Sequence, residues 1–303
     1  MRNAGWEFWI DRGGTFTDVI VREPGGALRT IKVLSENPSQ YDDAAVHVIR
    51  SVLLESNTIR PDGRIPPGVV EQVLIGTTLA TNALLERRGA QTGLIITRGF
   101  RDLLEIGYQN RPDLFALEIV KPKSLAHTIA EVNERVLADG SIDMPLDPAD
   151  ARKAIESIRE SGADSLAIVL LHSYLNPEHE LEIERIAGAF GFRNISLSHR
   201  VAREIKAVPR GFTTLADAYL TPVLRDYVTR LRKELGPDVP LRFMQSAGGL
   251  VDADSFSGKD AILSGPAGGV SALRNLQERT PFKKLIGFDM GGTSTDVSRV
   301  DDG

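Results

Sequence analysis

The sequence predicts an α/β fold, and three observations lead to that prediction. Residues 6–100 show short apolar runs and amphipathic segments in the order β-β-β-α-β-α-β. Residues 101–283 alternate helical and strand patterns as βαβ units do, which favours a partly parallel sheet. Residues 284–303 open with another buried strand. We therefore expect a first domain, an α/β middle region and the start of a further domain, divided at these positions.

The first region begins with three strands joined by tight glycine turns, Gly13-Gly14 and Pro24-Gly25-Gly26. After Asp42-Asp43, apolar residues recur at spacings of three and four, which indicates one buried helix face. A strand, a helix ended by Gly89 and a last strand follow. The expected elements are strands at 8–10, 16–21, 28–34, 73–75 and 93–97, and helices at 45–53 and 77–88.

The middle region starts with a loop-rich stretch at 107–122, a candidate lid or substrate loop, and then becomes regular. Its longest helix is predicted at 214–235, where Pro222 marks a kink or a start. Two glycine-rich turns, at 246–249 and 264–269, precede the final strand at 284–289. The other expected elements are helices at 147–161 and 177–190 and strands at 166–171, 194–198 and 241–244.

Composition excludes several classes of protein. Lys and Arg number 36 against 41 Asp and Glu, a net charge of −5 without a long basic stripe, so we expect no nucleic-acid partner. The chain has no cysteine, which excludes disulfides, thiol nucleophiles and Cys-ligated metals. No leader and no stretch of about 18 apolar residues occurs, so we expect a cytoplasmic protein without a membrane partner.

A nine-residue motif occurs twice, near the two ends of the chain. Residues 11–19 read DRGGTFTDV and residues 289–297 read DMGGTSTDV, so seven of nine positions are identical. Each copy follows a short apolar run and reads as a strand, a Gly-Gly turn and a returning strand. A single Asp-x-Gly-Gly is also a common hairpin turn, but a matched pair points to a shared function.

The motif suits the binding of a nucleotide phosphate chain from both sides. Glycines let backbone N–H groups approach phosphate oxygens, and threonine hydroxyls add donors. The leading aspartates, Asp11 and Asp289, would be repelled by phosphate and are expected to hold magnesium, which makes them the candidate catalytic and metal-binding groups. The predicted phosphate contacts are Gly13, Gly14, Thr15, Gly291, Gly292 and Thr293.

Each copy carries a second carboxylate. Asp18 and Asp296 follow the leading aspartates by seven residues, a spacing that would put the two side chains on opposite faces of a straight strand. The sequence assigns these two residues no role.

The paired hairpins resemble the phosphate motifs of the superfamily of acetate and sugar kinases, Hsp70 and actin, which implies an RNase H-like fold. The first copy together with the strand before it is similar to the hydantoinase A and 5-oxoprolinase family. The arginine at position 12 of this motif is similar to the pattern of the oxoprolinase branch. The resemblance implies ATP-driven opening of a cyclic amide, in oxoprolinases 5-oxo-L-proline to L-glutamate, with Mg²⁺ and, in many members, K⁺. The matching stretches are residues 8–19, 76–87, 97–104, 111–115 and 264–270.

A cyclic substrate with a carboxylate requires a cation and several hydrogen-bond donors. A strand-to-helix junction supplies free N–H groups, and Arg98 ends the next strand. The alternative is that Thr77 is a helix cap and Asn82 a surface residue. The substrate candidates are Thr77, Thr78, Thr81, Asn82 and Arg98, with Tyr108 and Arg111 as weaker ones. For His172 and His179 we expect solvated or capping roles.

The superfamily pattern implies that the second nucleotide-binding half is truncated after its opening hairpin. Leu285, Ile286, Phe288 and Val297 would then be poorly covered. We expect the N-terminal part of a longer ATP-dependent cyclic-amide hydrolase, completed by a C-terminal half, a second subunit or self-association. Two alternatives stay open: a hydantoinase, carboxylase or small-molecule kinase subunit, and an inactive fragment.

Overall fold

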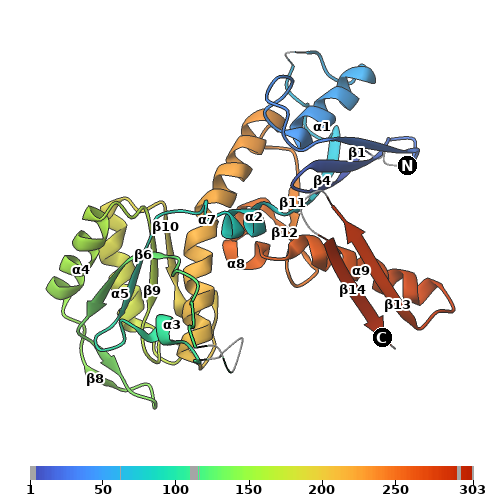
Figure 1. The fold of residues 1–303 in the computed structure, drawn as a ribbon. Helices are drawn as coiled ribbons and strands as arrows, with labels where there is room; N and C mark the ends of the chain where they lie inside the picture. Colours follow the sequence, from blue (N-terminus) through green and yellow to red (C-terminus); the bar gives the residue numbers. More distant parts are fainter. Residues whose placement is uncertain (1–4, 62, 110–114, 116, 292–294, 302–303) are drawn as a thin grey trace. The chain divides into compact units, whose positions relative to one another are not determined.

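The computed structural model describes residues 5–61, 63–109, 115, 117–291 and 295–301. It is an α/β protein with mixed sheets that divides into two compact units (Figure 1). Unit 1 comprises the chain up to Arg87 and from Leu224 onward, and unit 2 comprises Arg88–Val223. In the described part of the chain, no helix is long and apolar enough to cross a membrane.

A six-stranded mixed sheet forms the centre of unit 1. Its strand order is β12-β11-β4-β1-β2-β3, in which β1, β2 and β3 are antiparallel neighbours and β4 runs parallel to both β1 and β11. The strands are β1 (Trp6–Arg12), β2 (Phe16–Arg22), β3 (Leu28–Leu34), β4 (Val70–Thr77), β11 (Leu241–Met244) and β12 (Leu250–Asp252).

One face of β1 and β2 is covered by α1 (Ala44–Glu55). The helix starts where Asp43 accepts a hydrogen bond from the Val46 N–H at 3.0 Å, which satisfies one of the free donors of the first turn. Phe8 and Ile10 of β1 are buried on this face. Because side chains alternate along a strand, Arg12 shares this face and Asp11 lies on the other.

A second hairpin belongs to unit 1. It consists of β13 (Lys284–Met290) and β14 (Thr295–Asp301), and it packs on α9 (Ser264–Arg279). The hairpin and α9 approach closely at Gly287, where a Cβ would lie 2.5 Å from the end of the Leu273 side chain of α9, so that side chain would have to move. The remaining elements of this unit are α2 (Leu79–Leu85), η2 (Ala253–Ser255) and α8 (Gly258–Ala261).

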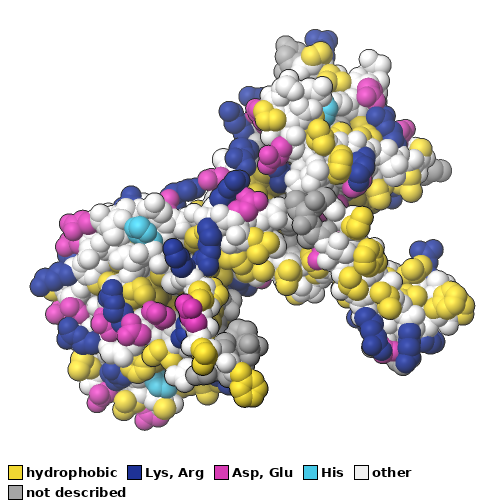
Figure 2. Space-filling view, in the orientation of Figure 1, with side chains coloured by type: hydrophobic (Ala, Val, Ile, Leu, Met, Phe, Trp, Pro, Cys, Tyr) yellow, Lys and Arg dark blue, Asp and Glu magenta, His cyan; other side chains and the backbone are white. Residues whose placement is uncertain are grey.

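The other face of this hairpin is uncovered, as expected. Ile286, Phe288 and Val297 are 74%, 68% and 64% exposed, whereas Leu285 is half-buried. Apolar side chains reach the surface in this part of the molecule in Figure 2. Strand β13 therefore pairs with β14 and packs on α9, while the outer face of the hairpin is apolar and exposed.

Unit 2 contains a four-stranded parallel sheet in the order β10-β9-β5-β6. Ile95, Ile155 and Ile168 are fully buried in the core between this sheet and its helices. The strands are β5 (Thr92–Thr97), β6 (Ala126–Val132), β9 (Ser165–Val169) and β10 (Asn194–Leu197), with a hairpin of β7 (Arg135–Val136) and β8 (Ile142–Met144). The helices are α3 (Leu103–Ile106), α4 (Pro148–Glu160), α5 (Glu178–Ala187), η1 (Gly188–Phe190) and α6 (Ser198–Val201).

One long helix, α7 (Ala207–Leu235), contributes residues to both units. It begins seven residues before the expected start at Thr214 and continues through Pro222. Proline has no N–H to donate to the carbonyl four residues earlier, that of Ala218. The Ser165 hydroxyl donates to this carbonyl at 2.6 Å, which explains why the helix does not end there.

The order β-β-β-α-β-α-β predicted for the first region is confirmed. The last of these strands, β5, joins the sheet of unit 2, and β11 lies beside β4 in unit 1. Along the chain, the boundaries between the two compact units fall at residues 87/88 and 223/224. The domain boundaries expected near 100 and 283 stay a prediction.

Candidate functional site

The turn of the first hairpin is fixed by a short chain of hydrogen bonds. The Gly13 N–H donates to the Phe16 carbonyl at 3.1 Å, and a Cβ on Gly13 would lie 3.0 Å from that oxygen. The Ser35 hydroxyl donates to the Gly13 carbonyl at 2.7 Å and lies 3.0 Å from the buried Thr17 hydroxyl. The Ser35 N–H donates to the Thr15 carbonyl at 2.9 Å. A side chain at Gly13 would therefore crowd this turn, and the backbone of the turn is held in place by hydrogen bonds.

The two aspartates of each motif lie side by side. Asp11 is the register partner of Asp18 across β1 and β2, and Asp289 is the partner of Asp296 across β13 and β14. Directly paired residues share a face, so the turn brings together side chains that a straight strand would separate. Asp18 also accepts hydrogen bonds from Lys32 Nζ at 2.7 and 2.8 Å.

The leading aspartates of the two hairpins act on each other electrostatically. Partial removal of water raises the pKa of Asp11 above its usual value, and the negative charges of Asp289 and Asp18 raise it further. Lys32 opposes this shift. Among the described residues, no group of three or more acidic or histidine side chains could hold a metal ion. A cation between the hairpins would therefore need further oxygen ligands from phosphate or water.

The remaining phosphate candidates are only partly described. Gly14 is exposed, Thr15 is half-buried and Gly291 is exposed at the end of β13. Gly292 and Thr293 lie outside the described residues.

The strand-to-helix junction after β4 is bonded to both the first hairpin and α9. The Thr78 N–H donates to the Arg12 carbonyl at 3.2 Å, and the Ser264 hydroxyl donates to the Thr77 carbonyl at 3.1 Å. Thr81 Oγ1 accepts from the Leu263 N–H at 3.3 Å. Three segments distant in sequence therefore meet at this junction.

The substrate candidates differ in their exposure and in the hydrogen bonds that their side chains already make. Thr77 is buried and its hydroxyl accepts from the Leu79 N–H at 3.1 Å, whereas the residue that caps α2 is Thr78 and not, as the capping alternative expected, Thr77. The Asn82 amide donates to Thr78 Oγ1 at 3.3 Å. Arg98 is exposed at the end of β5 and belongs to the other unit. Tyr108 is also exposed in unit 2, and Arg111 lies outside the described residues.

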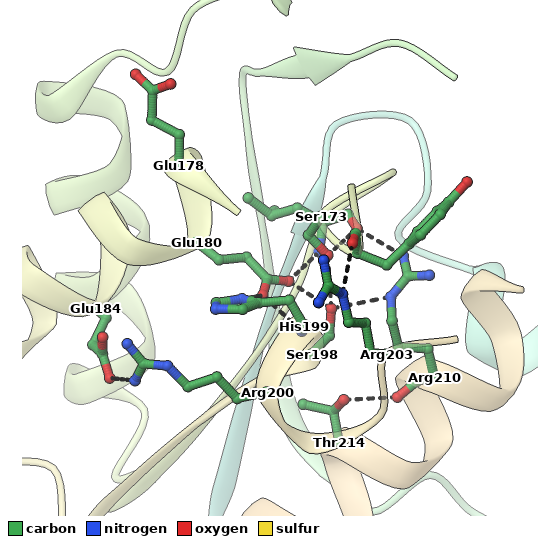
Figure 3. A network of polar contacts seen from close by, with 12 residues as sticks. Ser173, Glu178, Glu180, Glu184, Ser198, His199, Arg200, Arg203, Arg210 and Thr214 are labelled. Carbon is green, nitrogen blue, oxygen red and sulfur yellow. Dashed lines mark hydrogen bonds and ion pairs between the residues drawn. The ribbon is translucent and has the colours of Figure 1, made fainter. Parts of the chain in front are cut away.

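Unit 2 holds a buried polar network that the sequence analysis missed (Figure 3). The Glu180 carboxylate is fully buried and accepts from the Leu170 N–H at 3.1 Å and the Ser198 hydroxyl at 2.6 Å. The ring and backbone N–H of His199 donate to its other oxygen at 2.6 and 3.1 Å. The buried Arg210 donates to Ser198 Oγ at 3.1 Å and to the Leu170 carbonyl at 2.9 Å. Every oxygen of Glu180 is thus satisfied.

A second buried pair lies beside this network and corrects the expectation for His179. The side chain is buried, and its Nε2 accepts from the Leu146 N–H at 3.3 Å. Its Nδ1 must then carry the hydrogen that is donated to Glu134 at 2.8 Å. The solvated role is therefore wrong for His179. The helical spacing of buried positions along α5 would have revealed it, because His179 lies four residues before the buried Ile183.

The chain is similar to known proteins over nearly its whole length. Residues 7–191 match the model of the hydantoinase/oxoprolinase N-terminal region, and residues 210–303 match the hydantoinase/oxoprolinase model. The chain belongs to the hydantoinase/oxoprolinase family. It is 44% identical to 5-oxoprolinase 1 of Arabidopsis thaliana over 97% of its own length, and it spans about a quarter (25%) of that relative.

Two solved structures share the fold of this family member. A nucleotide-free acetone carboxylase aligns with a TM-score of 0.79 and 25% identity, over 100% of this chain and 44% of the other. The ATP-dependent caprolactamase of Pseudomonas jessenii aligns with a TM-score of 0.77 and 32% identity, over 97% of this chain and 43% of the other. The chain therefore corresponds to less than half of each polypeptide.

The electrostatic position of Asp11 predicts a pH-dependent stability. Because its folded-state pKa is raised, ionisation of Asp11 destabilises the fold, and stability is lost as the pH rises from 3.8 through the folded-state value. In metal-free buffer at pH 7, Asp11→Asn should raise the melting temperature by about 1–3 °C. The gain should vanish below pH 3.8, where both side chains are neutral. Asp143→Asn, at an exposed position, is the control; a gain of the same size there would contradict the prediction.

The buried network predicts a large loss of stability in Glu180→Ala. The substitution removes the charge that compensates the buried Arg210 and the acceptor at 2.6 Å from the Ser198 hydroxyl, so the free energy of unfolding should fall by about 3–5 kcal/mol. Glu184→Ala is the matched control on the same helix, since Glu184 pairs with the exposed Arg200 and should cost less than about 1 kcal/mol. Urea unfolding followed by circular dichroism measures both, and equal losses would refute the network's importance.

Proposed function

We propose that this chain is the N-terminal, nucleotide-binding part of an ATP-dependent cyclic-amide hydrolase that opens 5-oxo-L-proline to L-glutamate. The observation that carries the proposal is the pair of matching Asp-x-Gly-Gly-Thr hairpins whose leading carboxylates act on each other. The 44% identity to a 5-oxoprolinase supports the choice of substrate. Each hairpin would open an RNase H-like domain, of which the second is present only in part.

In this proposal, the hairpins bind the phosphates of ATP between them. Backbone N–H groups at the glycines and the threonine hydroxyls would contact phosphate oxygens. Asp11 and Asp289 would hold Mg²⁺, which fits the raised pKa of Asp11, since a divalent cation offsets the repulsion between like charges. The bound ion would neutralise phosphate charge during transfer. The proposed phosphate contacts are Gly13, Gly14, Thr15, Gly291, Gly292 and Thr293.

The chemistry follows from the weakness of a lactam as an electrophile. Transfer of the γ-phosphoryl group from ATP to the lactam oxygen releases ADP and converts that oxygen into a leaving group. Water then adds to the ring carbon, and the ring C–N bond breaks as the nitrogen takes up a proton, which leaves an acyl phosphate. A second water hydrolyses the acyl phosphate to the carboxylate and inorganic phosphate. The protein's contribution to phosphoryl transfer is positioning and charge neutralisation, which two rigid hairpins can supply.

The junction after β4 is the proposed substrate site. Thr81 accepts a hydrogen bond from the Leu263 N–H, so its own hydroxyl hydrogen stays available for a substrate carboxylate. Thr77, Thr78 and Asn82 lie on the same segment of unit 1. The substrate role of Arg98, in unit 2, stays a prediction.

The outer face of the second hairpin defines the partner that the proposal requires. When Asp289 is aligned with Asp11, the exposed Ile286, Phe288 and Val297 match Phe8, Ile10 and Val19, which are buried under α1 in the first hairpin. We infer that a strand and helix equivalent to β3 and α1 cover this face. They would come from a C-terminal continuation or a second subunit, and a second copy of the chain is the alternative source.

The likeness to acetone carboxylase favours one competing function, that of a carboxylase or kinase subunit that phosphorylates a substrate without opening a ring. Calorimetric titration with Mg-ATP, followed by an assay for glutamate released from 5-oxoproline, separates the possibilities. Binding with glutamate release supports the hydrolase. ATP hydrolysis without glutamate favours the alternative, and a folded chain that does neither, alone or with its completing partner, is an inactive fragment.

The phosphate contacts predict the effect of a branched side chain in either hairpin. Gly14→Val and Gly292→Val should each weaken Mg-ATP binding by about 100-fold or more, because the added methyl groups would occupy the phosphate path. Gly25→Val is the control, because a Cβ there meets nothing within 4 Å. Unchanged affinity in both hairpin variants, measured by calorimetry, would remove the phosphate assignment.

A further inference from the structure

The two copies of the motif differ at the residue after the leading aspartate. The first copy has Arg12 and the second has Met290, whereas the aspartate, both glycines and the first threonine are shared. A residue that contacted phosphate in the same way in both copies would be expected in both. The arginine therefore serves something particular to the first hairpin.

The Arg12 side chain lies on the opposite face of β1 from the Asp11 side chain. It lies on the face of β1 that α1 covers, and its side chain is only 15% exposed. Its guanidinium carbon lies 5.5 Å from the centre of the Tyr227 ring of α7, within cation–π distance. Its Nε lies 4.0 Å from the carboxylate of Asp43, the residue that caps α1.

Tyr227 is a rigid platform for this contact. The side chain is fully buried, and its ring packs edge-on against Phe243 of β11 at 6.1 Å. Burial raises the pKa of its hydroxyl, so the ring stays neutral at physiological pH. Neither the Tyr227 hydroxyl nor Arg12 Nε has a hydrogen-bond partner among the described residues, so stacking and charge hold the cluster together.

The backbone of the same residue holds the junction after β4. The Arg12 carbonyl accepts from the Thr78 N–H at 3.2 Å and from the Thr78 hydroxyl at 3.4 Å. Arg12 also directly precedes Gly13, whose N–H closes the turn. A shift of this one residue would move both the proposed phosphate turn and the proposed substrate junction.

We propose that Arg12, stacked on Tyr227 and paired with Asp43, is a positioning residue that anchors the first hairpin to α7 and α1. It acts through the hairpin backbone and does not itself touch the nucleotide. Its effect on ATP binding rests on the proposed function, whereas the anchor itself is a property of the chain without ligand.

Amide hydrogen exchange of the nucleotide-free chain tests the anchor. Arg12→Met, which installs the residue of the second copy, and Tyr227→Leu should speed exchange of the Gly13 and Thr78 amides by about three- to tenfold, the worth of one partly buried cation–π contact. Tyr227→Phe is the matched control, because it keeps the ring and removes only an unpartnered hydroxyl; its exchange should equal that of the unmodified chain.

The amides of Val73 in unit 1 and Ile168 in unit 2 serve as references for general loosening. The proposal would be overturned if, in both variants, the exchange rates of the Gly13 and Thr78 amides stayed within twofold of those in the unmodified chain. An equal increase in the exchange rate of the Val73 amide would also overturn it.

Nucleotide affinity gives the second readout. Arg12→Met should weaken Mg-ATP binding by about three- to tenfold and Tyr227→Phe should not. If the unmodified chain does not bind Mg-ATP, either alone or with its completing partner, the proposed function fails, and the exchange experiment still decides whether Arg12 anchors the hairpin.

Discussion

Asp289 lies close enough to Asp11 for its negative charge to contribute to the raised pKa of Asp11, and several elements of unit 1 carry these two carboxylates. Asp11 is carried by a six-stranded sheet and Asp289 by a separate two-stranded hairpin. Helix α9 connects the two: its first residue bonds to the end of β4, and its length packs on β13 and β14. Packing of apolar side chains supplies the free energy that offsets the electrostatic repulsion.

The sequence predicts well what local patterns determine. The order of the first seven elements follows from periodicity and glycine turns, because each depends on residues within about ten positions. The place of β5 and β11 could not be derived, since the pairing of Leu241 with Val73 joins residues far apart in the chain. Periodicity also underestimates α7, in which the carbonyl freed by Pro222 accepts a hydrogen bond from a hydroxyl on a distant strand.

The candidate site likewise combines features that local sequence patterns predict with features that depend on tertiary packing. The hairpins and their duplication are visible in the sequence, and the side-by-side placement of Asp11 and Asp18 could have been derived from the length of the turn. The stacking of Arg12 on Tyr227 and the burial of Glu180 depend on tertiary packing that one sequence does not encode locally. The two copies also expose opposite faces, because α1 covers one hairpin and α9 covers the other from the reverse side.

The continuity of α7 through Pro222 affects how the protein can move. At 29 residues and 1.5 Å per residue, the helix is a rod of about 43 Å. A proline usually makes a helix bend easily, but here the freed carbonyl of Ala218 is held by Ser165, so the rod lacks a joint at that point. The chain passes between the units at two places, and only the one near Arg87 lies outside a regular helix. The chain at 223/224 is therefore stiffened by a continuous helix, whereas the connection near Arg87 is not part of one.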